Sequence, residues 1–177
     1  DYWRKLESAY QVHALPIKAE REARLSELRA VRLITLNYCP MNCSFCSSTN
    51  FLHAAQGGET AKIARLDASE CLQMIVRIAA AQPRVRTILF QDDIFCFTKD
   101  QRLVELCAKI VAAKNSGTLP KALSFISTNR IDAMNEERLQ AMSDAGFRVL
   151  GFGIENFSLN VLKEFNKGQI HKHIGAV

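Results

Sequence analysis

The chain has 177 residues, 48% of them hydrophobic, and carries a formal net charge of +5. This length and apolar content suffice for one sizeable core and exclude a disordered chain. No apolar run is long enough to cross a bilayer, so we expect no membrane partner. The positive charge is spread along the chain and does not separate an anionic or RNA partner from a neutral substrate. The scattered cysteines, without a secretory signal, predict a reducing, cytoplasmic compartment.

The first third of the chain predicts helices, a strand and a long loop. Residues 1–30 are charged and helical in pattern, with a break at Pro16, and we expect them to be an N-terminal helical linker. Residues 31–36 predict the first strand, and residues 47–66 are polar and predict a long loop. Asp67 then caps a predicted helix that runs to about residue 82.

The rest of the chain alternates between strands and helices. The predicted strands are 86–90, 123–127 and 147–152, and the predicted helices begin at Thr98, Asn135 and Ser158, with Gly146 and Gly168 closing the last two and another helix near His171. Four strands, each followed by a helical unit, predict an α/β fold with a parallel sheet. We expect a partial TIM-like barrel of four β/α units that stays open, with its helices on one outer face.

Three cysteines with a regular spacing follow the first predicted strand. Cys39, Cys43 and Cys46 form a C-x3-C-x2-C motif within eight residues. Three thiolates this close in sequence can converge on one metal centre, and iron–sulfur clusters are held by cysteine thiolates. Three ligands leave one iron of a four-iron cluster open to a small molecule. The motif therefore favours a reactive site over a closed structural one.

Three other interpretations of these cysteines remain open. A structural zinc site would use His53 as its fourth ligand, but the chain has no second C-x2-C pair to complete a usual zinc module. Buried free thiols are common in protein cores, but this run is rich in Pro, Asn and Ser and is typical of a loop. Disulfides would require an oxidising compartment.

Polar residues also follow each of the other three predicted strands. These groups occupy residues 91–93, 128–130 and 153–156. The carboxyl ends of parallel strands lie at one rim of the sheet, where sites form in such folds. These three groups and the cysteine loop, which carries Cys39, Cys43 and Cys46, are therefore expected to open on the same rim and to form a single site.

These motifs together resemble a known family. The cysteine motif carries an aromatic residue, Phe45, just before its third cysteine, and residues 89–95 are similar to an F-x-D-D-x-F signature. Residues 146–168 resemble a Gly-Ile-Glu-Ser block. The chain thus resembles the core of a radical S-adenosylmethionine (SAM) enzyme of the cobalamin-dependent branch. The resemblance covers about residues 31–170, and we expect 31–177 to be a partial radical SAM core.

The resemblance implies a set of cofactor contacts. Cys39, Cys43 and Cys46 would bind a [4Fe–4S] cluster whose open iron takes the amino and carboxylate groups of SAM, and one electron would then yield a deoxyadenosyl radical. A guanidinium fork suits a carboxylate partner. The further contacts implied are Phe45 near the adenine, Gln91, Asp92 or Asp93 at the SAM ammonium, Arg130 at the SAM carboxylate, and Glu155 at the ribose or ammonium, with Ser127 or Asn129 beside it.

Each of these residues also has a structural interpretation. Asp92 and Asp93 could serve a turn or a helix entry, and Arg130 could pair with Asp132. Glu155 could be a first-turn carboxylate favoured by the helix dipole. The remaining cysteines are expected in the core or in packing roles, and these are Cys71, Cys96 and Cys107.

The chain also departs from the family that it resembles. The family core has six strand–helix units, whereas this sequence predicts four, without the Gly-rich block of a fifth strand or a preceding cobalamin-binding domain. Asn156 stands where Ser is usual. We therefore expect a piece of a larger protein or a truncated chain.

The leading hypothesis for function is radical chemistry, a methylation or rearrangement, on an unknown small-molecule substrate. A reductant protein would supply the electron, and cobalamin, if used, would be bound by a domain outside this chain. One alternative is methylthiotransferase-like tRNA modification. Another is a zinc-dependent nucleic-acid-binding module, which the sequence disfavours because it lacks clustered Lys and Arg with interleaved aromatic residues.

Overall fold

The computed structural model describes residues 2–48, 51, 54, 57 and 62–167. One sheet is made of β1 (Ala30–Leu33), β2 (Thr87–Phe90), β3 (Ser124–Asn129) and β4 (Phe147–Phe152). The strand order is β1-β2-β3-β4, and every neighbouring pair is parallel. The predicted α/β fold, with parallel strands in sequential order and an open sheet, is confirmed.

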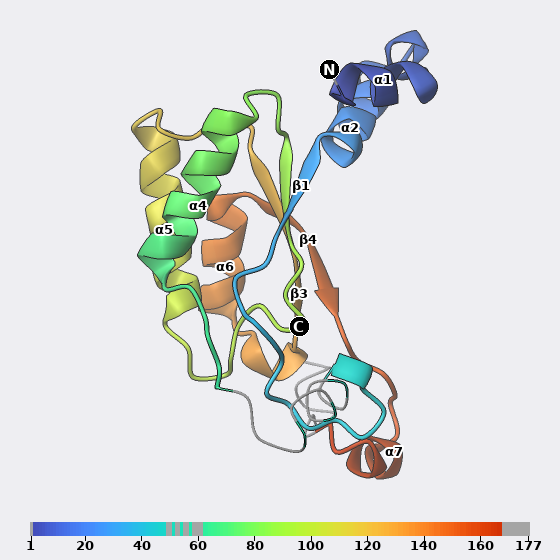
Figure 1. Ribbon diagram of the computed structural model, residues 1–177, viewed down its shortest axis with the longest axis vertical. Helices are drawn as coiled ribbons and strands as arrows, with labels where there is room; N and C mark the ends of the chain where they lie inside the picture. Colours follow the sequence, from blue (N-terminus) through green and yellow to red (C-terminus); the bar gives the residue numbers. More distant parts are fainter. Residues whose placement is uncertain (1, 49–50, 52–53, 55–56, 58–61, 168–177) are drawn as a thin grey trace.

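Helices lie on one face of this sheet and at its two ends. The sheet is covered on one face by α4 (Ala68–Ala81), α5 (Arg102–Asn115) and α6 (Glu136–Ala145) (Figure 1). The short α7 (Leu159–Glu164) lies at the end that carries the cysteine loop. At the opposite end are α1 (Tyr2–Ala9), the 3-10 helix η1 (Val12–Ala14) and α2 (Lys18–Leu28) (Figure 1). None of the described helices has the length and apolar character needed to cross a membrane.

The core lies between the sheet and the helices, because alternate strand residues point to that face. Ile88, Phe125 and Phe147 follow one another across the strands in register and are buried. Phe125 and Phe147 have ring centroids 5.3 Å apart, and Phe90 packs on Phe95 at 4.2 Å. These aromatic pairs add to the free energy gained by burying apolar area.

The other face of the sheet is only partly covered. The register row Arg32, Leu89, Ile126 and Val149 points away from the helices. Val149 is 54% exposed, whereas Leu89 and Ile126 are half-buried. A parallel sheet usually has both faces covered, so this row is what an open partial barrel presents on its inner side.

Local signals fix three helix ends where the sequence predicts them. Asp67 caps α4 in a capping box: its Oδ1 accepts from the Glu70 N–H at 2.8 Å, and Glu70 accepts from the Asp67 N–H at 2.8 Å. Asn135 caps α6 by accepting from the Arg138 N–H at 2.9 Å. Gly146 closes α6 with φ +97°, a conformation that favours glycine.

Among the element boundaries that differ from the sequence prediction, two lie beside aspartates, Asp92 and Asp100. The first strand ends at Leu33 rather than residue 36, because the next backbone N–H groups turn to the Asp92 carboxylate. The helix expected from Thr98 begins at Arg102. Asp100 accepts from the Arg102 N–H at 3.0 Å, so the capping carboxylate lies after Thr98 in the chain.

The last helix also ends differently. α7 stops at Glu164, and Asn166 adopts φ +51°, the left-handed conformation expected of Gly168. The Asn166 N–H donates to the Lys163 carbonyl at 3.0 Å, which closes the turn. Asn is the residue other than Gly that most readily takes this conformation. Gly168 and the helix expected near His171 lie outside the described residues.

Candidate SAM and iron–sulfur site

A cavity of about 180 Å³ opens at the rim where the strands end, and we call it the rim pocket. It is lined by all three motif cysteines, Cys39, Cys43 and Cys46. It is also lined by five other residues of the predicted site: Phe45, Asp93, Asn129, Arg130 and Glu155. Ligand pockets usually hold about 300–1,000 Å³, so a ligand as large as SAM would extend beyond this cavity.

None of the three motif cysteines forms a disulfide, and they differ in exposure. Cys43 is buried, and Cys39 and Cys46 are half-buried. Burial raises the pKa of Cys39 above its ordinary value of 9.0, and the charges of Asp93, Cys43 and Cys46 raise it further. A bound cation would reverse this effect by favouring the thiolate.

The donor set fits an iron–sulfur cluster in its chemistry. Among the residues that the structure describes, three thiols and no histidine line the rim pocket, and iron–sulfur clusters take thiolate ligands. Among the described residues, no three Cys, His, Asp or Glu side chains form a group arranged to hold a metal ion. The motif cysteines therefore share a pocket without being preorganised, and their side chains would have to converge on a ligand. His53, the fourth ligand of the zinc alternative, lies outside the described residues.

The cysteine loop is held on one side by the end of α7. Ser44 donates from its N–H to the Phe165 carbonyl and from its hydroxyl to the Glu164 carbonyl, both at 2.9 Å. The Asn166 amide donates to the Asn42 carbonyl at 2.6 Å. The Phe45 and Phe165 ring centroids are 4.9 Å apart. Hydrogen bonds thus join the cysteine loop directly to the end of α7.

The two adjacent aspartates point to different places. Asp93 lines the rim pocket and accepts from the Ser48 hydroxyl at 2.7 Å. Asp92 is 4% exposed and accepts from the N–H groups of Thr35 and Leu36 at 2.6 and 2.7 Å. Asp92 therefore has the turn role that the sequence left open for the pair, and Asp93 is the aspartate that lines the pocket.

Three other predicted site residues lie at different depths. Asn129 lines the rim pocket and is 3% exposed, and its amide donates to the Ser127 hydroxyl at 3.0 Å. Ser127 is fully buried beneath it and is outside the pocket lining. Gln91 is exposed, and it too is outside that lining. The structure therefore groups Asn129, but not Ser127 or Gln91, with the cysteines.

Arg130 lines the rim pocket while it makes two internal contacts. Its guanidinium donates to both carboxylate oxygens of Asp132, at 2.9 and 2.7 Å, and to the Lys167 carbonyl at 2.8 Å. The side chain is 12% exposed. The ion pair with Asp132 is therefore present, and it fixes the guanidinium at the pocket wall.

Lys167 is a pocket residue to which the sequence analysis assigned no role. Its Nζ donates to Glu155 Oε1 at 2.9 Å and lies 5.6 Å from the centre of the Phe45 ring. The Lys167 side chain is 9% exposed. Its signal in the sequence was weak, because a lone lysine after a helix is usually a surface residue. Burial of its ammonium beside a carboxylate and an aromatic ring becomes visible only in the fold.

Glu155 adopts a backbone conformation that is uncommon for its residue type. Its φ is +64°, in the left-handed region. A non-glycine residue pays a cost there, and such residues gather at functional sites. The Lys167 ion pair holds this carboxylate at the pocket wall.

Comparison with known proteins identifies the family. The model of the radical SAM superfamily matches residues 33–174, which is most of the chain. This chain belongs to the radical SAM superfamily. The resemblance to a radical SAM core is confirmed, and with it the assignment to a family of enzymes.

Similar proteins of the superfamily include a curated relative and two solved structures. An uncharacterized methyltransferase from Pyrococcus horikoshii is 27% identical over 136 residues, which are 77% of this chain and 26% of that protein. The radical SAM methyltransferase TsrM from Kitasatospora setae, with cobalamin and a [4Fe–4S] cluster bound, has a TM-score of 0.66 at 15% identity and covers 82% of this chain. The cobalamin-dependent SAM radical enzyme OxsB has a TM-score of 0.60 at 19% identity and covers 87%.

The chain spans about a quarter of the length of these proteins: 26% of the relative, 25% of TsrM and 22% of OxsB. At these identities the two structures establish a shared fold. The radical SAM fold therefore places the rim pocket where the carboxyl ends of the parallel strands meet.

Proposed function

We propose that this chain is the cofactor-binding part of a radical SAM enzyme, with a [4Fe–4S] cluster held by Cys39, Cys43 and Cys46. The observation that carries the proposal is the rim pocket, which three cysteines without disulfides line together with charged side chains from three strand ends. When bound, the cluster supplies one electron to SAM, which starts radical chemistry.

The charges in the rim pocket suit the amino-acid end of SAM. Arg130 and Lys167 provide two cations, and Asp93 and Glu155 provide two carboxylates. An amino-acid group presents an ammonium and a carboxylate, so it can exchange partners with a balanced set of this kind. We assign the SAM ammonium to Asp93 and the SAM carboxylate to Arg130. Phe45 lines the rim pocket and is 45% exposed, and we assign it to the adenine.

Methylation is the reaction that the comparisons support best. The Pyrococcus horikoshii relative is named a methyltransferase, and TsrM is a methyltransferase with cobalamin bound. We infer a cobalamin-associated methyltransferase whose cobalamin is bound outside this chain. A small-molecule substrate, a reductant protein for the cluster and a cytoplasmic location belong to the same proposal.

Anaerobic reconstitution with iron and sulfide tests the proposal. We expect about four irons and four sulfides per chain, as a [4Fe–4S] cluster requires, and a change in the electron paramagnetic resonance (EPR) spectrum of the reduced protein when SAM is added. Stoichiometric zinc without sulfide would instead support the zinc module. An EPR spectrum that does not change when SAM is added would contradict the assignment of SAM to the open iron of the cluster.

A further inference from the structure

The two segments that flank the cysteine loop in sequence are hydrogen-bonded to each other. We call the segments 35–37 and 64–66 the loop roots. Leu36 and Arg65 form an antiparallel bridge. The Leu66 N–H donates to the Thr35 carbonyl at 2.9 Å, and the Asn37 N–H donates to the Ala64 carbonyl at 3.0 Å. The segment that carries the three cysteines therefore leaves and rejoins the fold at one place.

A buried carboxylate from the next strand end holds the first root. Asp92 Oδ1 accepts from the N–H groups of Thr35 and Leu36, and Oδ2 accepts from the Thr35 hydroxyl at 2.9 Å. Asp92 and Thr35 are 4% and 3% exposed. Buried charges need hydrogen-bond partners, and three donors satisfy this carboxylate. Leu36, the second N–H donor, lies only three residues before Cys39 in the chain.

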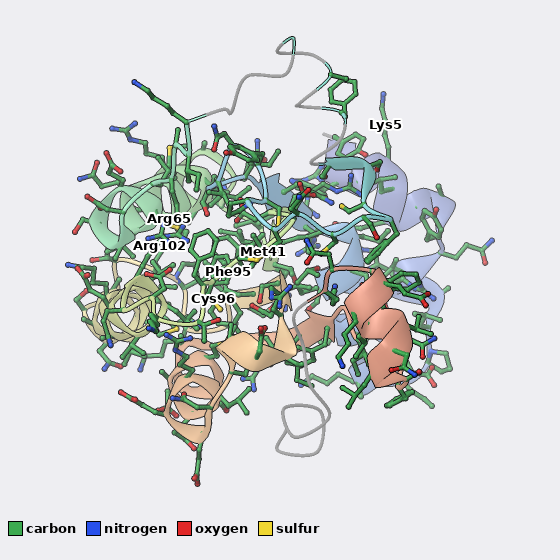
Figure 2. All side chains as sticks on the ribbon, turned by 90° about the horizontal axis from the view of Figure 1, so that it is seen from below. Lys5, Met41, Arg65, Phe95, Cys96 and Arg102 are labelled. Atoms are coloured by element: carbon green, nitrogen blue, oxygen red, sulfur yellow. The ribbon has the colours of Figure 1, made fainter. Side chains whose placement is uncertain are left out.

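Arg102 extends this arrangement to α5. Its Nη2 donates to the Thr35 hydroxyl at 2.6 Å, and its Nη1 donates to the Phe95 carbonyl at 3.2 Å. The guanidinium lies 5.5 Å from the Phe95 ring centre, and Figure 2, seen from the cysteine-loop end, shows the two side by side. The Thr35 hydroxyl thus donates to a buried anion and accepts from a buried cation. These two hydrogen bonds fix the position of the Thr35 hydroxyl.

We propose that Asp92 is the positioning residue of the cysteine loop, acting through Thr35, and that Asp93 is the member of the pair that meets the ligand. The inference rests on the proposed function, in which the cysteine loop binds the cluster. Sequence alone treated the two aspartates as equivalent candidates for the SAM ammonium. The structure separates them, because the Asp92 carboxylate is used by backbone and hydroxyl donors outside the pocket lining.

The first test uses the metal-free protein and residue-resolved amide exchange. The reporters are the N–H groups of Asn37 and Leu66, which bond between the roots rather than to Asp92. In Asp92→Ala and Thr35→Val we expect these amides to exchange about ten- to a hundredfold faster. This factor corresponds to the free energy lost with a hydrogen bond to a charged group. Thr35→Ser restores the hydroxyl and should exchange like the parent. Asp93→Ala is the matched control and should leave both reporters unchanged.

The second test uses the reconstituted protein. We expect Thr35→Val to split or broaden the EPR signal of the reduced cluster, and Thr35→Ser to restore the parent spectrum. Unchanged exchange rates of the two reporter amides in Thr35→Val would overturn the inference, and so would an equal acceleration in Asp93→Ala. If Asp92→Ala does not fold, the comparison of Thr35→Val with Thr35→Ser still decides the matter. A parent protein that binds no iron would overturn the proposed function alone, while the exchange data would still decide the role of Asp92.

Discussion

The Lys167 ammonium donates to the Glu155 carboxylate over 2.9 Å, so the residue that follows α7 neutralises the residue that follows β4. Each partner is at the wall of the rim pocket, and Glu155 is held in a left-handed conformation. A ligand that carries both charges can replace this internal pair by pairing with each partner. The pair therefore balances the charges of these two side chains in the pocket without a ligand.

Removal of the Lys167 charge should weaken SAM binding. In Lys167→Met the Glu155 carboxylate loses its cation and repels the SAM carboxylate, so we expect affinity to fall about tenfold, the lower range for a charged hydrogen bond. Lys167→Arg should retain most of the affinity. Lys163→Met, an exposed lysine of α7, is the control. Isothermal titration of SAM into cluster-loaded protein measures the effect, and equal loss in the Lys163 variant would remove Lys167 from the site.

The cluster ligands can be separated from a core cysteine. We expect Ala at Cys39, Cys43 or Cys46 to abolish the visible absorbance of the reconstituted cluster, whereas Cys71→Ala should keep it. Cys71 is fully buried, and burial raises its thiol pKa to about 11, so it stays protonated and is a poor ligand. Iron and sulfide analysis provides the measurement. Loss of iron in the Cys71 variant, with its fold intact, would be incompatible with the ligand assignment.

Arg130 should contribute most to recognition of the SAM carboxylate. Arg130→Ala is expected to weaken SAM binding about ten- to a hundredfold, because a hydrogen bond to a charged group is lost. Asp93→Asn should weaken it less, since an amide oxygen still accepts from the SAM ammonium. Arg77→Ala, an exposed arginine of α4, is the matched control. Unchanged affinity in Arg130→Ala would show that its pairing with Asp132 is its whole role.

Acid should weaken the attachment of the N-terminal helices. Glu7 is 3% exposed and accepts from Arg29 and Arg84, each at 2.7 Å. The Arg29 hydrogen bond is the main cause that lowers the pKa of Glu7 from 4.5 to about 2. Because this pKa is lower in the folded state, the stabilisation is complete above about pH 4.5 and is lost as pH falls toward 2.

A comparison of urea unfolding at about pH 6 and pH 3 tests this linkage. We expect Glu7→Gln to lower the free energy of unfolding at the higher pH by about 1.5–3 kcal/mol, the worth of a charged hydrogen bond. The difference between parent and variant should shrink at the lower pH. Glu20→Gln, an exposed carboxylate of α2, serves as the control. A constant difference at both pH values would refute the ion-pair explanation.

Gly146 should not tolerate a side chain. A Cβ there would lie 2.5 Å from Lys114 Nζ and 3.3 Å from the Leu123 carbonyl oxygen, and φ is +97°. We expect Gly146→Ala to cost about 2–4 kcal/mol, the sum of left-handed strain and overpacking. Gly117→Ala has φ +79° and open space around its Cβ, so it should cost about 1–2 kcal/mol from strain alone. Thermal unfolding gives both values, and equal costs would show that the contacts yield freely.

Sequence reasoning predicted the sheet well because its signals are local. Short apolar strands, the cap at Asp67 and the glycine at 146 each depend on neighbours in the chain, and each is confirmed. The site was predicted only as a group, because the side to which a residue points depends on distant donors. Asp92 turns to the backbone of Thr35, which lies 57 residues earlier. Similarly, Lys167 became a pocket residue only through its contact with Glu155.

The sequential order of the sheet also bears on how the protein is made. Each strand pairs with the strand that precedes it in the chain, from β1 to β4. A nascent chain can therefore add one strand and one helix at a time to what has already left the ribosome. The cysteines are synthesised before β2, β3 and β4, whereas the α7 end that holds their loop, through the Phe165 carbonyl, comes last among the described residues. The rim pocket is thus completed only after the four strands of the sheet have been synthesised.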